Sequence, residues 1–353
     1  MGIDKRDNHN AIDLLDIEQP VKPLDHSIPQ PAPGTPLFST IRQGNSTNAL
    51  TKFRDVGSKT AINDVTKTAT ITNNNCTLTI PNYDQLSGLA TSTYQLLDAI
   101  TIALTESGAK SPTVIIPLSD YMKRRELKDR KTAKAQVKAD MEILRQASFT
   151  WEEKRGKKTE SYSFVNLADS GEIRRNGDIV FTFGATFYSI LLKYPVMPYP
   201  AQLQTINNKR YPNSYYLLRK IEEHKNMNVG KKNENTISVK ILLDIAVFIP
   251  SYEDVMAGNK NLSSRIIEPF ERDMDALEPT LKWNYCHANN MPLEEKELQN
   301  LSYDIFKTLL INIEWVNYPD QTKRLETKQA KIEKAENNKT IKKRGRPRKK
   351  QPE

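Results

Sequence analysis

The chain has 353 residues, enough for two domains with separate cores and additional terminal segments. Most of its net charge of +9 lies in a C-terminal tail, since eight Lys or Arg and no acid occur between Lys339 and Lys350. Two cysteines, Cys76 and Cys286, provide neither a disulfide framework nor metal-ligand spacing. No apolar run has membrane-spanning length and no signal peptide is evident, so we expect a soluble cytoplasmic protein that does not enter a membrane.

Residues 1–75 are rich in Asn, Thr, Asp and Pro and contain few large apolar side chains. Such a composition cannot bury enough apolar surface to offset the entropy lost on ordering. We therefore predict a disordered N-terminal segment. Within it, residues 11–17 could form a short helix that docks on a partner.

The next part of the chain predicts helices and strands in a characteristic order. A short strand at 76–80 is followed by a helix at 91–106, a strand at 114–118, a short helix from Ser119 to Leu127 and a long helix at 129–147. Two extended arms, 149–153 and 161–167, then flank a basic turn. The order of helix, strand, helix, helix and hairpin is typical of a winged helix-turn-helix, here assigned with its connecting strand and helix to residues 76–211.

The same order recurs after Pro212. We predict a helix at 213–226, a strand at 236–239, a helix at 240–246, a helix at 261–277 and strands at 281–286 and 306–315. The sequence thus predicts an α+β protein with two tandem winged helix-turn-helix domains, the second spanning 212–318. Residues 319–353 form a charged tail.

Internal similarity supports a duplication. Residues 94–100 and 215–221 share Tyr, Leu, Leu and Ile at the same spacing, with an offset of 121 residues from Tyr94 to Tyr215. Residues 140–144 resemble 273–277 at an offset of 133 from Asp140 to Asp273. Two copies of one supersecondary unit explain these matches, and chance similarity between Leu-rich helices is the alternative.

The helix at 261–277 is amphipathic, with apolar residues at helical intervals. Pro269 lies in its middle, where the missing N–H leaves the carbonyl of Arg265 without its helical partner. We therefore expect this helix to bend.

Positive charge is concentrated around the third helix of the first unit. Eight basic residues against two acids lie between Lys123 and Lys138. Such a face is often merely solvated, but the third helix of a winged unit is the one that enters the major groove of DNA. The expected DNA contacts here are Lys123, Arg124, Arg125, Lys128, Arg130, Lys131, Lys134 and Lys138.

Further DNA contacts are expected at the wing and in the second unit. A basic hairpin tip beside the recognition helix can touch phosphate or the minor groove, which nominates Lys154, Arg155, Lys157 and Lys158. The corresponding helix of the second unit is less basic, and its candidates are Lys260, Ser263, Ser264, Arg265 and Arg272.

The C-terminal tail contains the run Arg344, Gly345, Arg346, Pro347 and Arg348 with basic flanks. Gly345 permits close approach to the floor of a narrow groove, and the arginines can enter the negative minor groove of A·T-rich DNA. The run resembles an AT-hook. A nonspecific polybasic tail is the alternative.

No catalytic or cofactor site stands out. Gly156-Lys157-Lys158-Thr159 superficially resembles a P-loop, but Trp151 occupies the position of its first glycine. The four histidines are scattered, so neighbouring residues cannot build a paired-histidine metal site. We expect no enzyme activity, no metal and no cofactor.

Three segments together resemble the plasmid replication initiators of theta-replicating, iteron-containing replicons. They are residues 215–218, which open the second unit, residues 236–239, and the step Ile266-Ile267-Glu268-Pro269 in the bent helix. The resemblance covers roughly residues 83–318. Two departures are a Leu where the family tends to place Arg after the opening aromatic, and the AT-hook-like tail.

The resemblance implies binding of double-stranded DNA at repeated origin sequences, opening of adjacent A·T-rich DNA, and recruitment of a host helicase or initiator protein. It also implies a switch between a monomer and a homodimer. A transcription regulator or phage DNA-binding protein with the same two units, without a role in replication, is the alternative.

Overall fold

The computed structural model describes residues 36–43, 58–63, 68–73, 76–80, 91–155, 158–258, 261–288, 290–294, 296–297 and 301–320. None of the helices in these ranges is long and apolar enough to cross a membrane.

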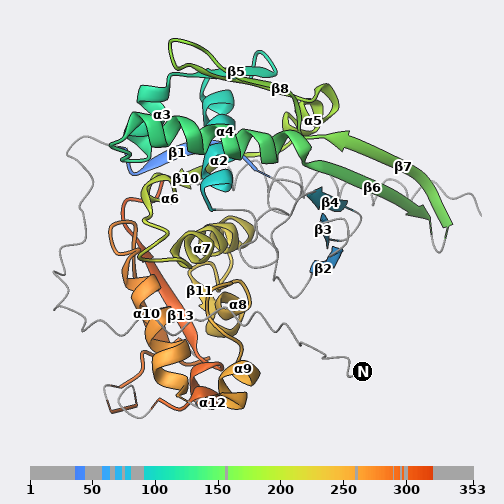
Figure 1. Cartoon of the computed structure of the whole chain (residues 1–353). Coiled ribbons are helices and arrows are strands. Elements are labelled where there is room, and N and C mark those ends of the chain that lie inside the picture. Colours follow the sequence, from blue (N-terminus) through green and yellow to red (C-terminus); the bar gives the residue numbers. More distant parts are fainter. Residues whose placement is uncertain are drawn as a thin grey trace, which may run out of the picture. The chain divides into compact units, whose positions relative to one another are not determined.

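The first winged-helix unit contains three helices and a three-stranded antiparallel sheet (Figure 1). The helices are α2 (Thr91–Glu106), α3 (Leu118–Arg124) and α4 (Arg130–Gln146). The sheet has the order β5-β9-β8 and is formed by β5 (Thr113–Ile116), β8 (Ala168–Ile173) and β9 (Ile179–Phe183). A strand between the first two helices thus pairs with a hairpin that follows the third helix, as in winged helices.

The second unit repeats this arrangement. Its helices are α7 (Ser214–Asn228), α8 (Val239–Leu243), and a π-helical turn η1 (Ser263–Ile267) that continues into α10 (Glu268–Asp275). Its sheet has the order β11-β13-β12, with β11 (Thr236–Ser238), β12 (Leu281–Cys286) and β13 (Leu310–Trp315). Two short helices are added, α9 (Tyr252–Ala257) before η1 and α12 (Tyr303–Phe306) between the last two strands. The predicted tandem winged-helix fold is confirmed.

A buried aspartate links the third helix to the first in both units. In the first unit, Asp140 Oδ1 accepts hydrogen bonds from the hydroxyls of Thr93 (2.7 Å) and Ser92 (3.0 Å) at the start of α2. In the second, Asp273 Oδ2 accepts from the backbone N (2.9 Å) and Nδ2 (2.8 Å) of Asn213, which precedes α7. The sequence similarity around these residues therefore reflects equivalent structural roles.

The hairpin that directly follows α4 is not the wing, contrary to the prediction. It consists of β6 (Ser148–Arg155) and β7 (Lys158–Asn166), and it belongs to a separate sheet with the order β2-β3-β4-β6-β7. β6 pairs with β4 (Cys76–Ile80), whereas β5 pairs with β9. The β8–β9 hairpin therefore occupies the position of the wing, and β6–β7 is an insertion before it.

The expectation of disorder throughout residues 1–75 is wrong for three strands. These are β1 (Phe38–Arg42), β2 (Ser58–Asn63) and β3 (Thr68–Asn73). β2 and β3 are rich in Thr, Ile and Ala and extend the sheet from β4, so alternating small and β-branched residues decide their structure despite the polar surroundings. β1 pairs with β10 (Val196–Pro200).

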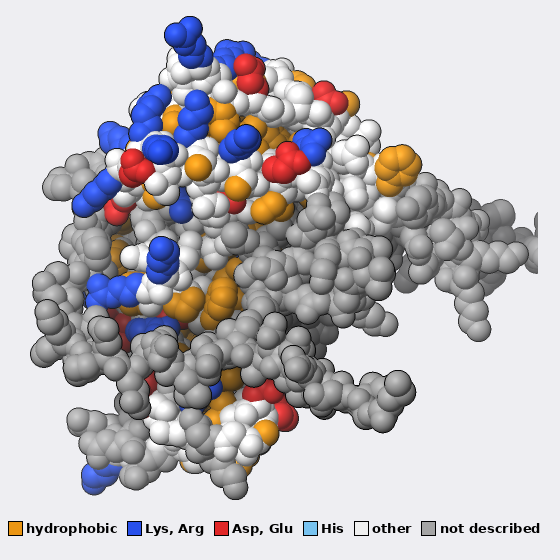
Figure 2. Space-filling view, viewed as in Figure 1, with side chains coloured by type: hydrophobic (Ala, Val, Ile, Leu, Met, Phe, Trp, Pro, Cys, Tyr) orange, Lys and Arg blue, Asp and Glu red, His pale blue; other side chains and the backbone are white. Residues whose placement is uncertain are grey.

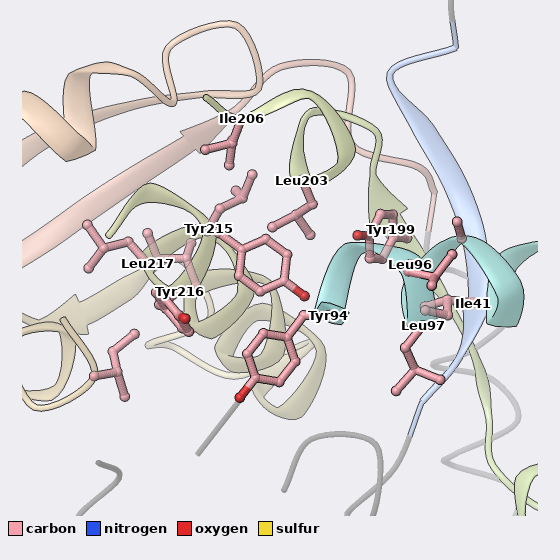
Figure 3. Close-up of a cluster of buried hydrophobic side chains, with 14 of the residues drawn as sticks. Ile41, Tyr94, Leu96, Leu97, Tyr199, Leu203, Ile206, Tyr215, Tyr216 and Leu217 are labelled. Atoms are coloured by element: carbon pink, nitrogen blue, oxygen red, sulfur yellow. The ribbon is translucent and has the colours of Figure 1, made fainter. Parts of the chain in front are cut away.

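Side chains from both units meet at their junction (Figure 3). The rings of Tyr94 on α2 and Tyr215 on α7 stack with their centroids 6.0 Å apart. The carboxylate of Asp98 pairs with Arg219 (3.5 Å) and also accepts hydrogen bonds from the hydroxyls of Tyr199 (2.7 Å) and Tyr215 (2.8 Å). Since Tyr94 and Tyr215, and likewise Asp98 and Arg219, occupy equivalent positions of the duplicated helices, each residue contacts its own counterpart.

The connection between the units contains α5 (Ala185–Leu191), β10 and α6 (Gln202–Thr205). Ile41 of β1 is buried against α2, and the guanidinium of Arg42 donates to the carbonyls of Leu192 (2.9 Å) and Tyr194 (3.1 Å). One continuous cluster of buried apolar residues extends through both winged-helix units. The connection is therefore a packed part of the fold.

Candidate nucleic-acid interface

The sequence of α4 fixes which of its faces is exposed. Asp129 caps the helix, and its Oδ2 accepts a hydrogen bond from the backbone N of Thr132 (2.7 Å). The bonds from Thr132 lower the pKa of Asp129, so the cap stays ionised beside the positive end of the helix dipole. One side of the helix is buried, and its core residues are Ala133, Val137, Met141 and Leu144.

The opposite side of α4 carries Lys131, Lys134 and Lys138, which are all exposed. Their spacing of three and four residues places them along one stripe of the helix. Among the residues that the structure describes, none of the three ammonium groups has a hydrogen-bond or ion-pair partner, although the charge of Lys138 lowers the pKa of the exposed Glu142 one turn later. The stripe is therefore available to an anionic partner.

Basic residues from the end of α3 extend this surface. Lys123, Arg124 and Lys128 are exposed, and we name these three together with Lys131, Lys134 and Lys138 the basic face. Figure 2 shows Lys and Arg side chains gathered over this part of the molecule. Within the described ranges, Arg124 is the only member of the basic face that forms an ion pair, with Glu106 at 3.4 Å, and both side chains are about 40% exposed.

Arg125 was predicted on this surface, but it turns inward. Its side chain is half-buried. Burial raises the pKa values of Tyr121 and Asp140, and the positive charge of Arg125 partly opposes this increase. Two of its guanidinium nitrogens, Nε and Nη1, are buried without a hydrogen-bond partner in the described structure. The charge run could not reveal this orientation because Arg125 is the C-terminal cap residue of α3.

Arg130, also predicted to contact DNA, is exposed and contacts the β8–β9 turn. Its Nη2 donates to the backbone carbonyl of Asn176 (3.1 Å). That turn carries two exposed arginines, Arg174 and Arg175, which the sequence analysis missed. The dipeptide Asn176-Gly177 between two alternating strands is a strong hairpin signal and could have located the wing.

The basic tip of β6–β7 has no demonstrated place in this interface. Lys154 and Arg155 end β6 and Lys158 begins β7, whereas Lys157 lies outside the described residues. Since this hairpin belongs to the five-stranded sheet, its predicted role as a wing is wrong.

In the second unit, the corresponding surface is less basic. Ser263, Ser264 and Arg265 are exposed in the π-helical turn, and the hydroxyl of Ser263 donates to Glu268 (3.1 Å). Arg272 pairs with the buried Asp273 at 2.8 Å and thus supports the fold. Lys260 lies outside the described residues.

This helix was predicted to bend at Pro269, and the structure has a π turn immediately before that residue. The backbone N–H of Glu268 bonds to the carbonyl of Ser263, five residues earlier, and Pro269 follows in the first turn of α10. Pro269 has no N–H and cannot bond to the carbonyl of Arg265, four positions earlier. The wider π turn is therefore compatible with a proline at this position. The π turn presents three consecutive polar residues, Ser263, Ser264 and Arg265, on the surface.

The exposed side chains of the basic face are of a type that binds anions. No group of three or more His, Cys, Asp or Glu within the described ranges could hold a metal ion. Exposed ammonium and guanidinium groups without acidic partners are suited to phosphate oxygens. The AT-hook-like run Arg344 to Arg348 lies outside the described residues.

Sequence comparisons return no relatives: no family model matches the chain, and no curated protein matches it. Among solved structures, the chain is similar to domains 2 and 3 of RctB, with 9% identity over 76% of this chain and 99% of that chain and a TM-score of 0.38. A second structure of RctB domains 2–3 matches at 8% identity over 53% of this chain and 83% of that chain, with a TM-score of 0.28.

The WH1 domain of MSBI1.176, a replication protein isolated from a multiple sclerosis patient, is a further match. Its identity to this chain is 15%, over 34% of this chain and 87% of that domain, and its TM-score is 0.25. Independently of these matches, the order and pairing of this chain's own helices and strands make it a tandem winged-helix protein.

Proposed function

We propose that this protein is a sequence-specific DNA-binding replication initiator. The observation that carries the proposal is the basic face: exposed lysines on the third helix of a winged-helix unit, none of which forms an ion pair in the described structure. A third helix in this position enters the major groove, where its exposed side chains reach base edges and phosphates.

The duplicated unit supports binding through two modules. When one unit is bound, the other is held near the same DNA, so its binding becomes intramolecular with a high effective concentration. The more basic first unit supplies most of the phosphate contacts, and the second unit contributes polar side chains of its π turn. Repeated origin sequences are the target that the sequence resemblance implies.

The first experiment identifies the target. The full chain is incubated with a random-sequence duplex library, and the retained DNA is sequenced. We expect enrichment of one extended motif, and footprinting on a duplex with that motif should show protection on one face of the DNA. A library that shows no enrichment over several rounds would refute sequence-specific binding.

A second experiment separates replication from transcriptional control. A plasmid that carries this gene and its flanking DNA, and that has no other replication origin, is tested for autonomous replication in a host cell. We expect replication that depends on direct repeats beside the gene, with opening of adjacent A·T-rich DNA and recruitment of a host helicase. Sequence-specific binding without replication would favour the transcription regulator or phage DNA-binding protein.

We further propose that the protein has no strand-cleaving activity and requires no cofactor. Incubation with supercoiled plasmid and Mg²⁺ should leave the plasmid supercoiled. The appearance of a nicked circle that depends on this protein would contradict the proposal and point to a relaxase-like enzyme.

The tail is proposed to add affinity for A·T-rich minor grooves. Removal of residues 339–353 should weaken binding to an alternating A·T duplex and leave the enriched motif unchanged. A variant with Arg344 and Arg346 replaced by Lys is the matched control, since it keeps the charge and removes the planar guanidinium groups. Equal affinity of this variant and the intact chain would indicate a nonspecific polybasic tail.

A further inference from the structure

The β8–β9 turn has a defined conformation. The N–H of Arg174 donates to the carbonyl of Asp178 (2.9 Å), and the N–H of Gly177 donates to the carbonyl of Arg174 (2.9 Å). The side chains of Asn176 and Asp178 add a further hydrogen bond of 2.8 Å. Gly177 has φ +97°, a conformation that L side chains rarely adopt. The hairpin tip is therefore an ordered turn.

Arg130 covers this turn from the beginning of α4. Its Nη2 donates to the carbonyl of Asn176 (3.1 Å). A Cβ atom at residue 177 would overlap this Nη2 and lie 3.4 Å from the guanidinium carbon. Gly177 is itself buried, so the absent side chain provides the space that the guanidinium occupies. The hydrogen bond and the close approach of the same guanidinium thus join the third helix to the wing.

The three arginines near the turn have different surroundings. Arg130 is engaged by the turn, and Arg174 lies 3.6 Å from Glu172. Arg175 is exposed and makes no ion pair or hydrogen bond with any described residue. Of these three, Arg175 is the one whose guanidinium is fully available to a phosphate or to a narrow minor groove.

We propose that Arg130 is a positioning residue that fixes the wing relative to the basic face, and that Arg175 is the DNA contact of the wing. The inference rests on the proposed function. A wing held in place before binding loses less conformational entropy when Arg175 meets the DNA. Arg130 therefore contributes to affinity through Arg175, although it touches no DNA itself.

A double-mutant cycle tests this coupling on the full chain, with the duplex that the library selection enriches, or a mixed-sequence duplex if none is enriched. We expect Arg130→Ala and Arg175→Ala each to weaken binding by roughly tenfold. The double variant should be little weaker than either single variant, because residues that act through one another are not additive.

The matched control pairs Lys131→Ala with Arg175→Ala. Lys131 is adjacent to Arg130 in sequence but belongs to the exposed stripe. The fold-decrease in DNA affinity of the double variant should therefore equal the product of the fold-decreases of Lys131→Ala and Arg175→Ala. If the losses of Arg130→Ala and Arg175→Ala also multiply, Arg130 binds DNA independently and the proposal is wrong. The hydrogen bond of Arg130 is exposed, so its loss should leave the thermal midpoint of unfolding nearly unchanged.

A second measurement tests the contact between Arg130 and the β8–β9 turn in the absence of DNA. Amide hydrogen exchange at residues 174–178 of the free protein should become faster in Arg130→Ala and in Gly177→Ala, and remain unchanged in Lys131→Ala. Unchanged exchange in Arg130→Ala would overturn the positioning role. If the intact chain binds no duplex at all, the proposed function fails, while the exchange result still decides whether Arg130 holds the turn.

Discussion

The two winged-helix units share a scaffold but differ in the charge that they place on their third helices. In the first unit, α4 is regular, begins at an aspartate cap and exposes Lys131, Lys134 and Lys138. In the second, a π turn leads into an α10 that carries Glu268, Glu271 and Asp275. The two third helices therefore keep the same fold through their buried faces, whereas their exposed faces differ in charge.

The wing of the first unit is also more basic than that of the second. The wing of the first unit is a short turn with Arg174 and Arg175. In the second unit, β12 and β13 are separated by residues 287–309, which include α12 and the acidic residues Glu294 and Glu297. We infer that the first unit supplies most of the electrostatic attraction to DNA and that the second supplies contacts with little dependence on salt.

The largest effect is expected from the exposed stripe of α4. Replacement of Lys131, Lys134 and Lys138 by Ala should weaken DNA binding by orders of magnitude, and the slope of log affinity against log salt should fall by about 2.7 if each lysine meets one phosphate. The matched variant replaces Ser263, Ser264 and Arg265 by Ala and should change the slope by about one at most. Equal slopes in both variants would show that the units do not differ in this way.

The buried aspartates provide a comparison of stability. Asp273→Ala should lower the free energy of unfolding by about 3 kcal/mol, because it leaves a buried backbone N–H and the amide of Asn213 without their acceptor. Asp140→Ala removes an acceptor from flexible hydroxyls and should be less destabilising. Urea denaturation measures both. A larger loss for Asp140→Ala would indicate that the first unit depends more strongly on this link.

The first helices of the two units should respond differently to pH. Burial raises the pKa of Glu222 on α7 to about 8, whereas its counterpart on α2 is the uncharged Thr101. Glu222 is therefore protonated in the folded chain and ionised in the unfolded chain between about pH 4.5 and 8. The free energy of unfolding should fall across this window by about 1.4 kcal/mol per pH unit from this group and level off above it.

Glu222→Gln is the matched variant, because it keeps the shape of the side chain and cannot ionise. Urea denaturation at a series of pH values should show a weaker decline of stability in this variant than in the intact chain. Identical profiles would mean that Glu222 does not titrate in this range.

The smallest effect is expected from Arg124. Its ion pair with Glu106 is exposed, so Arg124→Ala should change the free energy of unfolding by less than about 0.5 kcal/mol. The DNA-binding salt slope should nevertheless fall by about 0.9, as for any lost phosphate contact. Lys123→Ala, which removes no ion pair in the described structure, should produce the same slope and no change in stability.

Local signals predicted the individual elements well. The bounds of α2 match the prediction, because its apolar spacing is long and Gly108, with φ +76°, follows its end. The helix predicted at 129–147 corresponds to α4, and the strands predicted at 281–286 and 306–315 correspond to β12 and β13. These signals depend only on neighbouring residues, so they can be read from the sequence.

Pairing and orientation could not be predicted in the same way. The hairpin signal at 148–166 gave no indication that β6 pairs with β4, because strand partners are distant in sequence. A charge run likewise identifies residue types but not directions, so it could not show that Arg125 turns inward or that Arg130 donates to the carbonyl of Asn176. Because the pairing of β5 with β9 could not be inferred from the sequence, Arg174 and Arg175 were assigned to a connecting segment.

The contacts between counterpart residues at the junction have a consequence for assembly. If α2 met a second α2 in the same way, Asp98 would face another Asp98, and two copies of α7 would bring Arg219 against Arg219. Like charges at a buried contact disfavour both homotypic pairings, whereas the mixed pairing gains an ion pair. The opposite charges therefore favour the contact between α2 and α7 of one molecule over α2–α2 or α7–α7 contacts between two molecules. Both units must be present in the same chain for this contact to form within one molecule.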